Sequence, residues 1–460
     1  MGGGLLQLVA YGAQDVYLTG NPQITFFKVT YKRHSNFAIE AIEQTFNGNP
    51  TFGSRVTCQL TRNGDLINRV YLRAKFTNDN AENTTNGDTK PNNGVALVPY
   101  FGLKLLKTIE LEIGGQRIDK HYAEWLYIWN ELSLPAGKRD GYYLMVGGDR
   151  YNHSIYLGAK QSYYVNVPIE FWFCRNVGLA LPLIALQYHE VKINIEFEER
   201  ANLVDTTANF SNCAFNMINK LGVDIESSLF DNSELIGDTA KISLSDVSLW
   251  VDYIFLDTDE RRRFAQLTHE YLIEQLQFTG SDTITAGSNS MKSIRMNFNH
   301  PCKELVWYIK PNKDTSSTKN LYWTNFSSRN ADNETYIGNN PTENAKIQLN
   351  GNDRFAERDG NYFSLVQPYQ HHENTPDVFH KGINVYSFAI KPEEQQPSGT
   401  LNMSRIDTAI LQLGVFDATT TTQFTTIRSY KSSKSTLYVY ATNYNVLRIL
   451  SGMGGLAYSN

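Results

Sequence analysis

Residues 42–48 of this 460-residue chain are Ile42-Glu43-Gln44-Thr45-Phe46-Asn47-Gly48, and a similar stretch recurs as Ile273-Glu274-Gln275-Leu276-Gln277-Phe278-Thr279-Gly280. Each stretch is followed by a strand-like segment, residues 68–76 after the first and residues 303–310 after the second. Both landmarks are separated by about 230 residues, whereas a solenoid or propeller repeat spans only roughly 20–50 residues. This separation is the size of a whole all-β domain. The sequence therefore predicts two similar β domains, which favours a symmetric building block over a catalyst.

The composition favours β structure and argues against a nucleic-acid-binding protein. Charged residues make up 19% of the chain, below the roughly 25% usual for soluble proteins. The 27 Tyr and 24 Phe suit the pleated, half-buried surfaces of sheets. The formal net charge is −5, and because no face or tail is strongly basic we expect no direct contact with nucleic acid. No run of 18 apolar residues occurs, so no segment is expected to span a bilayer.

Hydrophobic periodicity and turn residues predict the local elements. The clearest strand spans residues 191–197, where apolar and polar residues alternate as they do in antiparallel sandwiches. Asn63-Gly64 and Gly114-Gly115 mark tight turns. Near-helical spacing predicts helices over residues 122–132 and 258–275, the second of which opens with acidic residues that suit a helix start.

The composition along the chain predicts four segments. Residues 1–23 are rich in glycine and weakly apolar, and we expect an extended arm. Strand signals then recur over residues 24–210, the first β domain, and over residues 240–460, the second. Residues 211–239 are polar with a weak pattern and are predicted to join the two domains.

The motifs predict no catalytic, cofactor-binding or metal-binding residue, so we do not expect an enzyme. His269-Glu270 begins like the helix of a zinc protease, but Ile273 stands where the second His should be. Residues 452–457 resemble a dinucleotide-binding loop, but the chain printed here leaves no room for the helix that would receive a phosphate. Neither a GxSxG elbow nor a Walker loop occurs.

The chain contains one cluster of histidines and carboxylates, made of His371, His372, Glu373, Asp377 and His380. The cluster lies in a Pro-containing stretch. The neighbouring His371 and His372 would point to opposite sides of an extended chain, which is poor geometry for two metal ligands. We expect a solvated loop here, with a metal site as the alternative.

The cysteines and glycosylation sequons carry no further prediction of a site. Without a CxxC pair, the cysteines are predicted to be buried, reduced thiols in a reducing compartment. No glycan is assigned to any sequon, because an Asn- and Thr-rich chain contains sequons by chance. The cysteines are Cys58, Cys174, Cys213 and Cys302, and the sequons are at Asn83, Asn152, Asn209, Asn325, Asn333 and Asn402.

Four stretches spread over the whole chain carry a specific resemblance. They are Leu8-Val9-Ala10-Tyr11-Gly12-Ala13-Gln14-Asp15-Val16-Tyr17-Leu18-Thr19-Gly20-Asn21-Pro22-Gln23-Ile24-Thr25-Phe26-Phe27, Arg62-Asn63-Gly64-Asp65-Leu66-Ile67, Pro397-Ser398-Gly399-Thr400-Leu401-Asn402-Met403-Ser404-Arg405-Ile406-Asp407, and Tyr440-Ala441-Thr442-Asn443-Tyr444-Asn445-Val446-Leu447-Arg448-Ile449-Leu450. In this order they resemble the major capsid proteins of large icosahedral DNA viruses, and most closely those of viruses that infect algae and amoebae.

This resemblance implies an all-β double jelly roll, in which two eight-stranded antiparallel β-sandwiches stand side by side with short helices in their loops. It also implies a homotrimer that forms a pseudo-hexagonal capsomer and tiles the shell of an icosahedral virion assembled in the host cytoplasm. The implied partners are the other copies of the trimer, neighbouring capsomers and minor capsid proteins, with an inner viral membrane nearby. No active site and no cofactor is carried over, because the family's role is assembly.

The alternative function is a carbohydrate-binding or host-attachment protein built on similar β-sandwiches. Aromatic side chains in loops, such as Tyr322 and Trp323, would then stack on sugars; the competing explanation for them is loop packing or a trimer contact. A jelly-roll metalloenzyme would need a converging set of His and carboxylate residues on strands, which the sequence does not offer.

Overall fold

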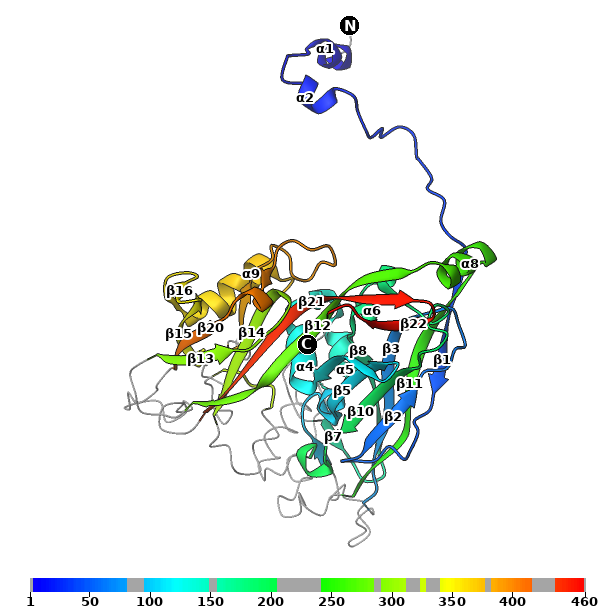
Figure 1. The fold of residues 1–460 in the computed structure, drawn as a ribbon, viewed down its shortest axis with the longest axis vertical. Helices are drawn as coiled ribbons and strands as arrows, with labels where there is room; N and C mark the ends of the chain where they lie inside the picture. Colours follow the sequence, from blue (N-terminus) through cyan, green and yellow to red (C-terminus); the bar gives the residue numbers. More distant parts are fainter. Residues whose placement is uncertain are drawn as a thin grey trace. The chain divides into compact units, whose positions relative to one another are not determined.

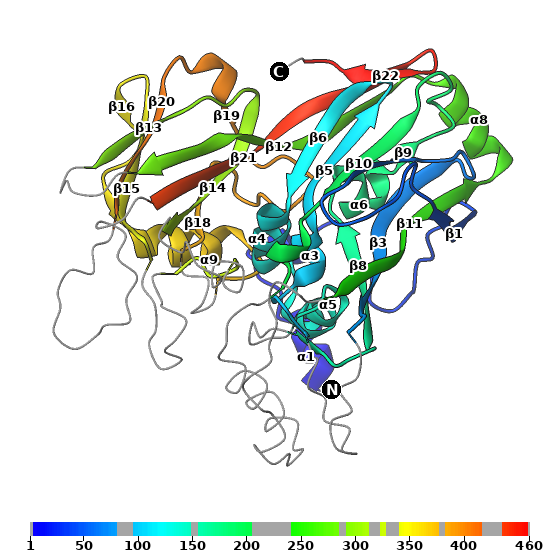
Figure 2. The ribbon, with the colours of Figure 1, turned by 90° about the horizontal axis from the view of Figure 1, so that it is seen from below.

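The chain folds into two antiparallel β-sandwiches that lie side by side in a computed structural model (Figures 1 and 2). Both sandwiches belong to one compact unit, Ala38–Asn460, and Met1–Phe37 forms a second unit. The structure describes residues 3–80, 95–148, 155–204, 241–284, 291–311, 323–327, 340–376, 382–415 and 435–458.

The first sandwich is made of two sheets that face each other. One sheet has the order β1 (Phe37–Gln44), β11 (Ile242–Leu256), β3 (Leu66–Asn78) and β8 (Ser162–Ile169), with β9 (Leu181–Pro182) beside β3. The other has the order β2 (Arg55–Gln59), β10 (Val191–Phe197), β5 (Leu106–Ile113) and β6 (Gln116–Tyr122). β4 (Val95–Leu97) pairs with β7 (Ile155–Leu157) in a separate two-stranded antiparallel sheet.

The second sandwich repeats this construction. One sheet has the order β12 (His269–Ile284), β21 (Ser435–Leu450), β14 (Pro301–Pro311) and β18 (Asn384–Ser387), with β19 (Leu401–Asn402) beside β14 and β22 (Met453–Leu456) beside β21. The other has the order β13 (Lys292–Met296), β20 (Ala409–Val415), β15 (Thr342–Leu349) and β16 (Asn352–Asp353), with β17 (Arg358–Asp359) beside β15.

The two sandwiches share one strand topology. Counted along the chain among the described strands, and leaving out the short additions, each sandwich pairs its first, eighth, third and sixth strands in one sheet and its second, seventh, fourth and fifth in the other. The stretches that recur in the sequence fall on equivalent strands, β1 with β12 and β3 with β14. The predicted duplication and the predicted double jelly roll are therefore confirmed.

Strand β11 changes the predicted division of the chain. It falls within residues 240–460, the range predicted for the second sandwich, but it pairs with β3 as the eighth strand of the first. We therefore place the division after Leu256 instead of at residue 240. The first strand begins at Phe37, so residues 24–36 precede the first sandwich. The predicted junction, residues 211–239, lies outside the described residues.

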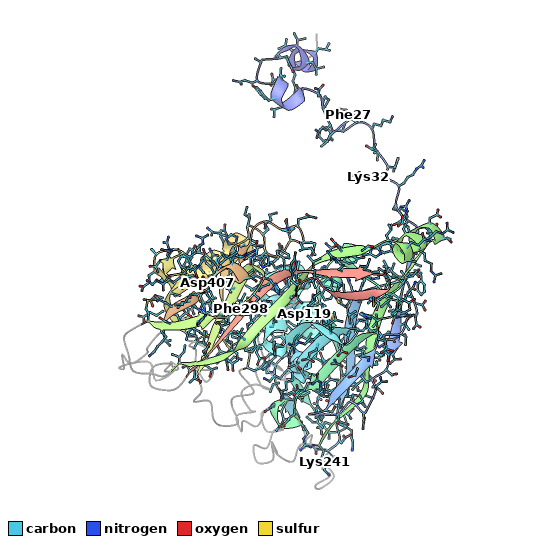
Figure 3. The ribbon with its side chains drawn as sticks, viewed as in Figure 1. Phe27, Lys32, Asp119, Lys241, Phe298 and Asp407 are labelled. Carbon is cyan, nitrogen blue, oxygen red and sulfur yellow. The ribbon has the colours of Figure 1, made fainter. Side chains whose placement is uncertain are left out.

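The alternation predicted for residues 191–197 decides the packing of β10. Ile193 pairs with Cys58 of β2 on one side and with Leu111 of β5 on the other. These side chains are fully buried and point into one core with those of the facing sheet, such as Leu72. The second sandwich encloses a separate cluster that includes Phe298 (Figure 3). Each jelly roll therefore has its own core.

The helices lie in the connections between strands. They are α3 (Phe101–Leu105), α4 (Ala123–Ser133), α5 (Arg139–Met145), α6 (Trp172–Arg175), α8 (Thr258–Gln266) and α9 (Gln367–His371), together with the π-helical turn η6 (Tyr362–Val366). The helix predicted over residues 122–132 is confirmed as α4. The helix predicted over residues 258–275 is wrong beyond Gln266, because the chain enters β12 at His269 and pairs with β21.

The amino-terminal segment differs from the predicted extended arm. It contains two short helices, α1 (Gly3–Val9) and α2 (Val16–Thr19), whose apolar side chains are exposed. Leu and Gln are good helix formers, which explains why α1 forms despite its glycines. Phe27 and Lys32 lie on the extended stretch that follows (Figure 3).

The strand phase of β10 can be tested by placing a charge on each face. Ile193→Asp puts an unpaired carboxylate into the core, and we expect it to cost several kcal/mol or to prevent folding. The control is Lys192→Asp on the outer face of the same strand, which we expect to cost less than about 1 kcal/mol. Chemical denaturation followed by circular dichroism measures both. Equal losses in the two variants would contradict the assigned phase.

Candidate functional site

The candidate functional site is the junction where the first sandwich covers the outer face of the β12–β21–β14 sheet. Helix α4 lies between the two sandwiches (Figure 2). Its Trp125 packs on Tyr440 of β21, with ring centroids 5.4 Å apart. Tyr122, at the end of β6, meets Phe278 of β12 edge to face at 5.2 Å. One hydrophobic cluster therefore runs from the first core across the junction.

The sequence of β14 explains why its outer face needs a cover. Leu305, Trp307 and Ile309 point into the core of the second sandwich. Val306 and Tyr308, which point the other way, are equally buried and pack in the cluster of the first sandwich. A strand that is apolar on both faces is typical of a sheet covered on both sides. The junction is therefore determined by the strand sequence itself.

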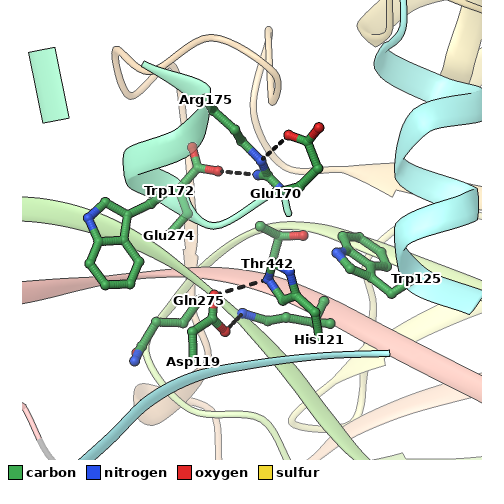
Figure 4. Close-up of a pocket in the computed structure, with 10 residues that line it drawn as sticks. Asp119, His121, Trp125, Glu170, Trp172, Arg175, Glu274, Gln275 and Thr442 are labelled. Atoms are coloured by element: carbon green, nitrogen blue, oxygen red, sulfur yellow. Dashed lines mark hydrogen bonds and ion pairs between the residues drawn. The ribbon is translucent and has the colours of Figure 1, made fainter. Parts of the chain in front are cut away.

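Charged side chains are buried at the same junction. Lys303 of β14, which is fully buried, forms an ion pair with Glu274 of β12 at 2.6 Å and donates to the carbonyl of Pro392 at 2.6 Å. Arg175 of α6 reaches across from the first sandwich to Glu274 at 3.0 Å (Figure 4). Its guanidinium also lies 4.0 Å from the ring centroid of Trp129. The two sandwiches thus share a charged network as well as an apolar contact.

His372, predicted to lie in a solvated loop, is instead part of a buried charged triad. Its side chain is fully buried and lies 3.1 Å from Glu304 of β14 and 2.7 Å from Glu393. Burial favours the neutral imidazole, but the two carboxylates outweigh burial and raise the pKa of His372 to about 9. Burial likewise opposes the charge of Glu304, but His372 and Lys303 hold the pKa of that carboxyl below its ordinary value.

Of the other members of the predicted cluster, the structure describes His371 and Glu373, and Glu373 is exposed. His371 is hydrogen-bonded to the carbonyl of Ile390, and Asp377 and His380 lie outside the described residues. Within the described ranges, no group of three His, Cys, Asp or Glu side chains could hold a metal ion.

The triad predicts a stability window. Because the pKa of His372 is raised, its contribution is complete below the ordinary value of 6.5 and is lost as the pH rises through about 9. Because the pKa of Glu304 is lowered, its contribution is present above the ordinary value of 4.5 and is lost at lower pH. We expect the free energy of unfolding to fall by roughly 2–4 kcal/mol from this histidine between pH 7 and pH 10. Denaturation across this range measures it.

His372→Gln should flatten the alkaline limb of that profile, whereas the matched variant His371→Gln should leave it unchanged. Tyr, Lys and Cys side chains titrate in the same range in all three proteins, so the difference between the profiles isolates His372. Parallel profiles for His372→Gln and the wild type would show that the triad is not coupled to folding.

The cavity at the junction is too small for a substrate. It is lined by Asp119, His121, Arg175 and Glu274 among others, and its volume is about 10 Å³ (Figure 4). Such a volume holds about one water molecule. Asp119 is already engaged, because it pairs with His121 at 3.0 Å and accepts from the backbone N–H of Leu276 at 3.1 Å. These contacts tie β6 to β12.

An open groove of about 670 Å³ lies beside this cavity, between β6 and β12. Amides such as Gln116, Gln277 and Asn299 line it. Its aromatic residues, Tyr122 and Phe278, pack on each other, which leaves them poorly placed to stack on a sugar.

The aromatic residues proposed for sugar stacking lie elsewhere. Trp323 is 3% exposed; its indole N–H donates to the carbonyl of Pro99 at 2.7 Å, and Lys104 lies over its ring at 5.1 Å. Loop packing therefore explains Trp323. Tyr322 lies outside the described residues.

The remaining motif residues, cysteines and sequons singled out in the sequence can also be located where the structure describes them. His269 opens strand β12, and residues 453–456 form β22, paired with β21. Cys58 and Cys302 are buried, Cys174 is partly buried, and burial raises the pKa of Cys58 to about 11. Cys213 and the sequons at Asn83, Asn152, Asn209 and Asn333 lie outside the described residues, whereas Asn325 is buried and Asn402 is exposed. Of the helices described, none is long and apolar enough to cross a membrane.

Sequence reasoning missed Lys303, Glu304 and Glu274 as members of a buried network. The available signal was the adjacent pair Lys303-Glu304 at the start of an otherwise apolar strand. Charged residues are almost never fully buried unless they are paired, so a charged pair on a two-sided apolar strand indicates buried partners. Their identity depends on contacts between distant segments.

Comparisons with known proteins match the whole chain. A family model described as "Major capsid protein N-terminus" matches residues 25–257, and one described as "Large eukaryotic DNA virus major capsid protein" matches residues 260–455. The chain is 48% identical to the major capsid protein of Pyramimonas orientalis virus and 44% identical to that of Paramecium bursaria Chlorella virus 1, over 100% of both chains in each case. A quasi-atomic model of the PBCV-1 virus capsid superposes with a TM-score of 0.73 at 37% identity, covering 95% of this chain and 100% of that chain.

Proposed function

This chain belongs to the family of major capsid proteins of large eukaryotic DNA viruses, and from this we propose that it assembles as a homotrimer, a pseudo-hexagonal capsomer that tiles the faces of an icosahedral shell. The family's members are structural proteins of the virion and not enzymes. The chain is accordingly a structural capsid component that assembles with neighbouring subunits.

The duplicated topology is the observation that carries the trimer proposal. Two sandwiches with the same strand order give three chains six similar wedges around one axis. A threefold assembly then has nearly hexagonal outlines, and hexagons tile a flat face. Most homo-oligomers close by rotational symmetry, and a trimer of duplicated domains combines that closure with a hexagonal lattice.

The oligomeric state tests this proposal. We expect native mass spectrometry and sedimentation equilibrium of the purified chain to give the mass of a trimer. Each interface of that trimer should bury more than about 2,000 Å², as in obligate assemblies. Electron microscopy of assembled particles should show hexagonal capsomers. A folded β protein that stays monomeric at micromolar concentration would contradict the proposal.

We propose further that the amino-terminal arm contacts minor capsid proteins or a neighbouring subunit on the inner side of the shell, in virions assembled in the host cytoplasm. Its exposed apolar residues support this proposal, because exposed apolar surface in a soluble protein marks contact sites. They include Leu8, Tyr17 and Leu18. An inner membrane is a weaker partner, because no basic residue precedes Lys28 to attract anionic lipid.

Deleting residues 2–20 tests the role of the arm. We expect the truncated chain to keep its trimer and its denaturation midpoint, since the arm forms a unit separate from the sandwiches. Particle yield in a co-expression assembly assay should fall. Normal yield and normal particle stability after the deletion would remove the assembly role of the arm.

A further inference from the structure

The two sandwiches contain equivalent sheets, β1–β11–β3–β8 and β12–β21–β14–β18. The outer face of the second sheet is covered by the first sandwich, so we compare it with the outer face of the first sheet. Aligning residues 68–76 with residues 303–310 from their first residues matches Tyr71 of β3 with Val306 of β14. The phase agrees, because the next residues, Leu72 and Trp307, both point into the core of their own sandwich. Tyr71 and Val306 therefore occupy equivalent places on the outer faces of equivalent sheets.

The neighbouring strands extend this equivalence. Tyr71 pairs with Trp250 of β11, and Val306 pairs with Tyr440 of β21. Trp250 thus holds in the first sandwich the place that Tyr440 holds in the second. Tyr440 is buried beneath Trp125 of α4, whereas Trp250 is only half-buried.

The face around Trp250, here called the open face, comprises Tyr71, Trp250, Arg73, Lys75 and Tyr164. The rings of Tyr71 and Trp250 stack within 8° of parallel, with centroids 6.3 Å apart. Arg73 and Lys75 lie over the ring of Tyr164 at 5.1 and 5.4 Å, and Tyr164 is 43% exposed. Aromatic side chains and arginine are enriched at protein–protein interfaces, and Tyr71, Trp250 and Arg73 supply both kinds here.

The element that covers the second sandwich also has an equivalent. Helix α4 lies between the fifth and sixth strands of the first sandwich, β6 and β8. In the second sandwich the corresponding connection, between β16 and β18, contains η6 and α9. Val366 and Tyr369 of this segment are 39% and 79% exposed. Within the part of the chain that the structure describes, the segment therefore presents exposed apolar side chains.

Charge supports the same pairing. At the covered face, Glu124 of α4 faces Lys104 and Lys310, which outweigh burial and lower its pKa. The open face carries Arg73 and Lys75, and beside it Arg69 of β3 lies near the carboxylate of Asp252. Directly after α9 the chain exposes Glu373.

We propose that the open face is the docking surface for the η6–α9 segment of a second copy of this chain, with Val366 and Tyr369 packing on Tyr71 and Trp250. Between two chains, this contact would repeat the packing of α4 on the outer face of the β12–β21–β14 sheet within one chain. It is head to tail, and such a contact closes into a ring when its rotation allows. This inference rests on the proposed homotrimer and identifies the surfaces that form it.

Single substitutions test the contact. Tyr369→Asp and Trp250→Asp should each weaken trimer association by at least about 30-fold, the loss expected at an interface hot spot, while the circular dichroism spectrum stays that of the wild type. The matched control is Tyr188→Asp, because Tyr188 is 75% exposed, close to Tyr369, but lies outside both surfaces. Sedimentation equilibrium over a concentration series measures all four proteins.

Crosslinking separates this inference from the trimer proposal. The cysteines are placed beside the anchors so that Trp250 and Tyr369 stay in place. A chain carrying both Arg73→Cys and Glu373→Cys, in a Cys213→Ser background and treated with a short bis-maleimide, should give covalent dimers and trimers on a denaturing gel. In the same Cys213→Ser background, each single variant, the chain without an added cysteine and a chain with Arg73→Cys and Tyr188→Cys should give none, because a head-to-tail contact joins the open face of one copy to the η6–α9 segment of the next. The remaining native cysteines are buried or partly buried.

A wild-type chain that sediments as a monomer would overturn the proposed homotrimer. A wild-type trimer that persists in Tyr369→Asp and Trp250→Asp, without crosslinks in the double-cysteine chain, would overturn this inference alone and leave the open face to another occupant.

Discussion

The structure depends on one constraint: β14 is apolar on both faces. Its inward residues build the core of the second sandwich, and its outward residues, Val306 and Tyr308, are just as deeply buried. Fully burying a large apolar side chain stabilises a fold by about 1.5–3 kcal/mol relative to leaving it exposed. The second sandwich therefore loses several kcal/mol if it stands alone, and α4 of the first sandwich supplies the missing cover. The two jelly rolls are thereby joined into one unit.

The buried charges at the junction add specificity to this apolar contact. Aromatic rings alone tolerate sliding, whereas Arg175, Glu274 and Lys303 fit in one arrangement. Desolvation offsets much of the attraction in a buried ion pair, so such a network is weak support for stability. Removing one partner is costly, at about 3–5 kcal/mol, because it leaves an unpaired buried charge. We interpret the network as fixing how the two sandwiches sit against each other within the chain.

Local patterns in the sequence predicted the strands, the duplication and α4, because alternation and helical spacing are properties of neighbouring residues. They did not predict which sheet β11 joins, since its partner β3 lies far away in the chain. The helix predicted over residues 258–275 started correctly at acidic residues and then failed, because pairing with β21 outweighs local helix preference from His269 onward. His372 was misplaced for the same reason: its partners Glu304 and Glu393 come from other segments.

The outer faces of the equivalent strands β3 and β14 differ in polarity, and this difference affects how the chain can fold and associate. β3 alternates apolar residues with Arg69, Tyr71, Arg73 and Lys75, so its outer face is soluble in a free chain, whereas the outer face of β14 is not. If both outer faces were as apolar as that of β14, the free chain would expose one and aggregate before assembly. If both were as polar as that of β3, the two sandwiches would have little to hold them together. One outer face is therefore closed within the chain, and the other is left amphipathic, which is the character that the proposed contact with a second copy needs.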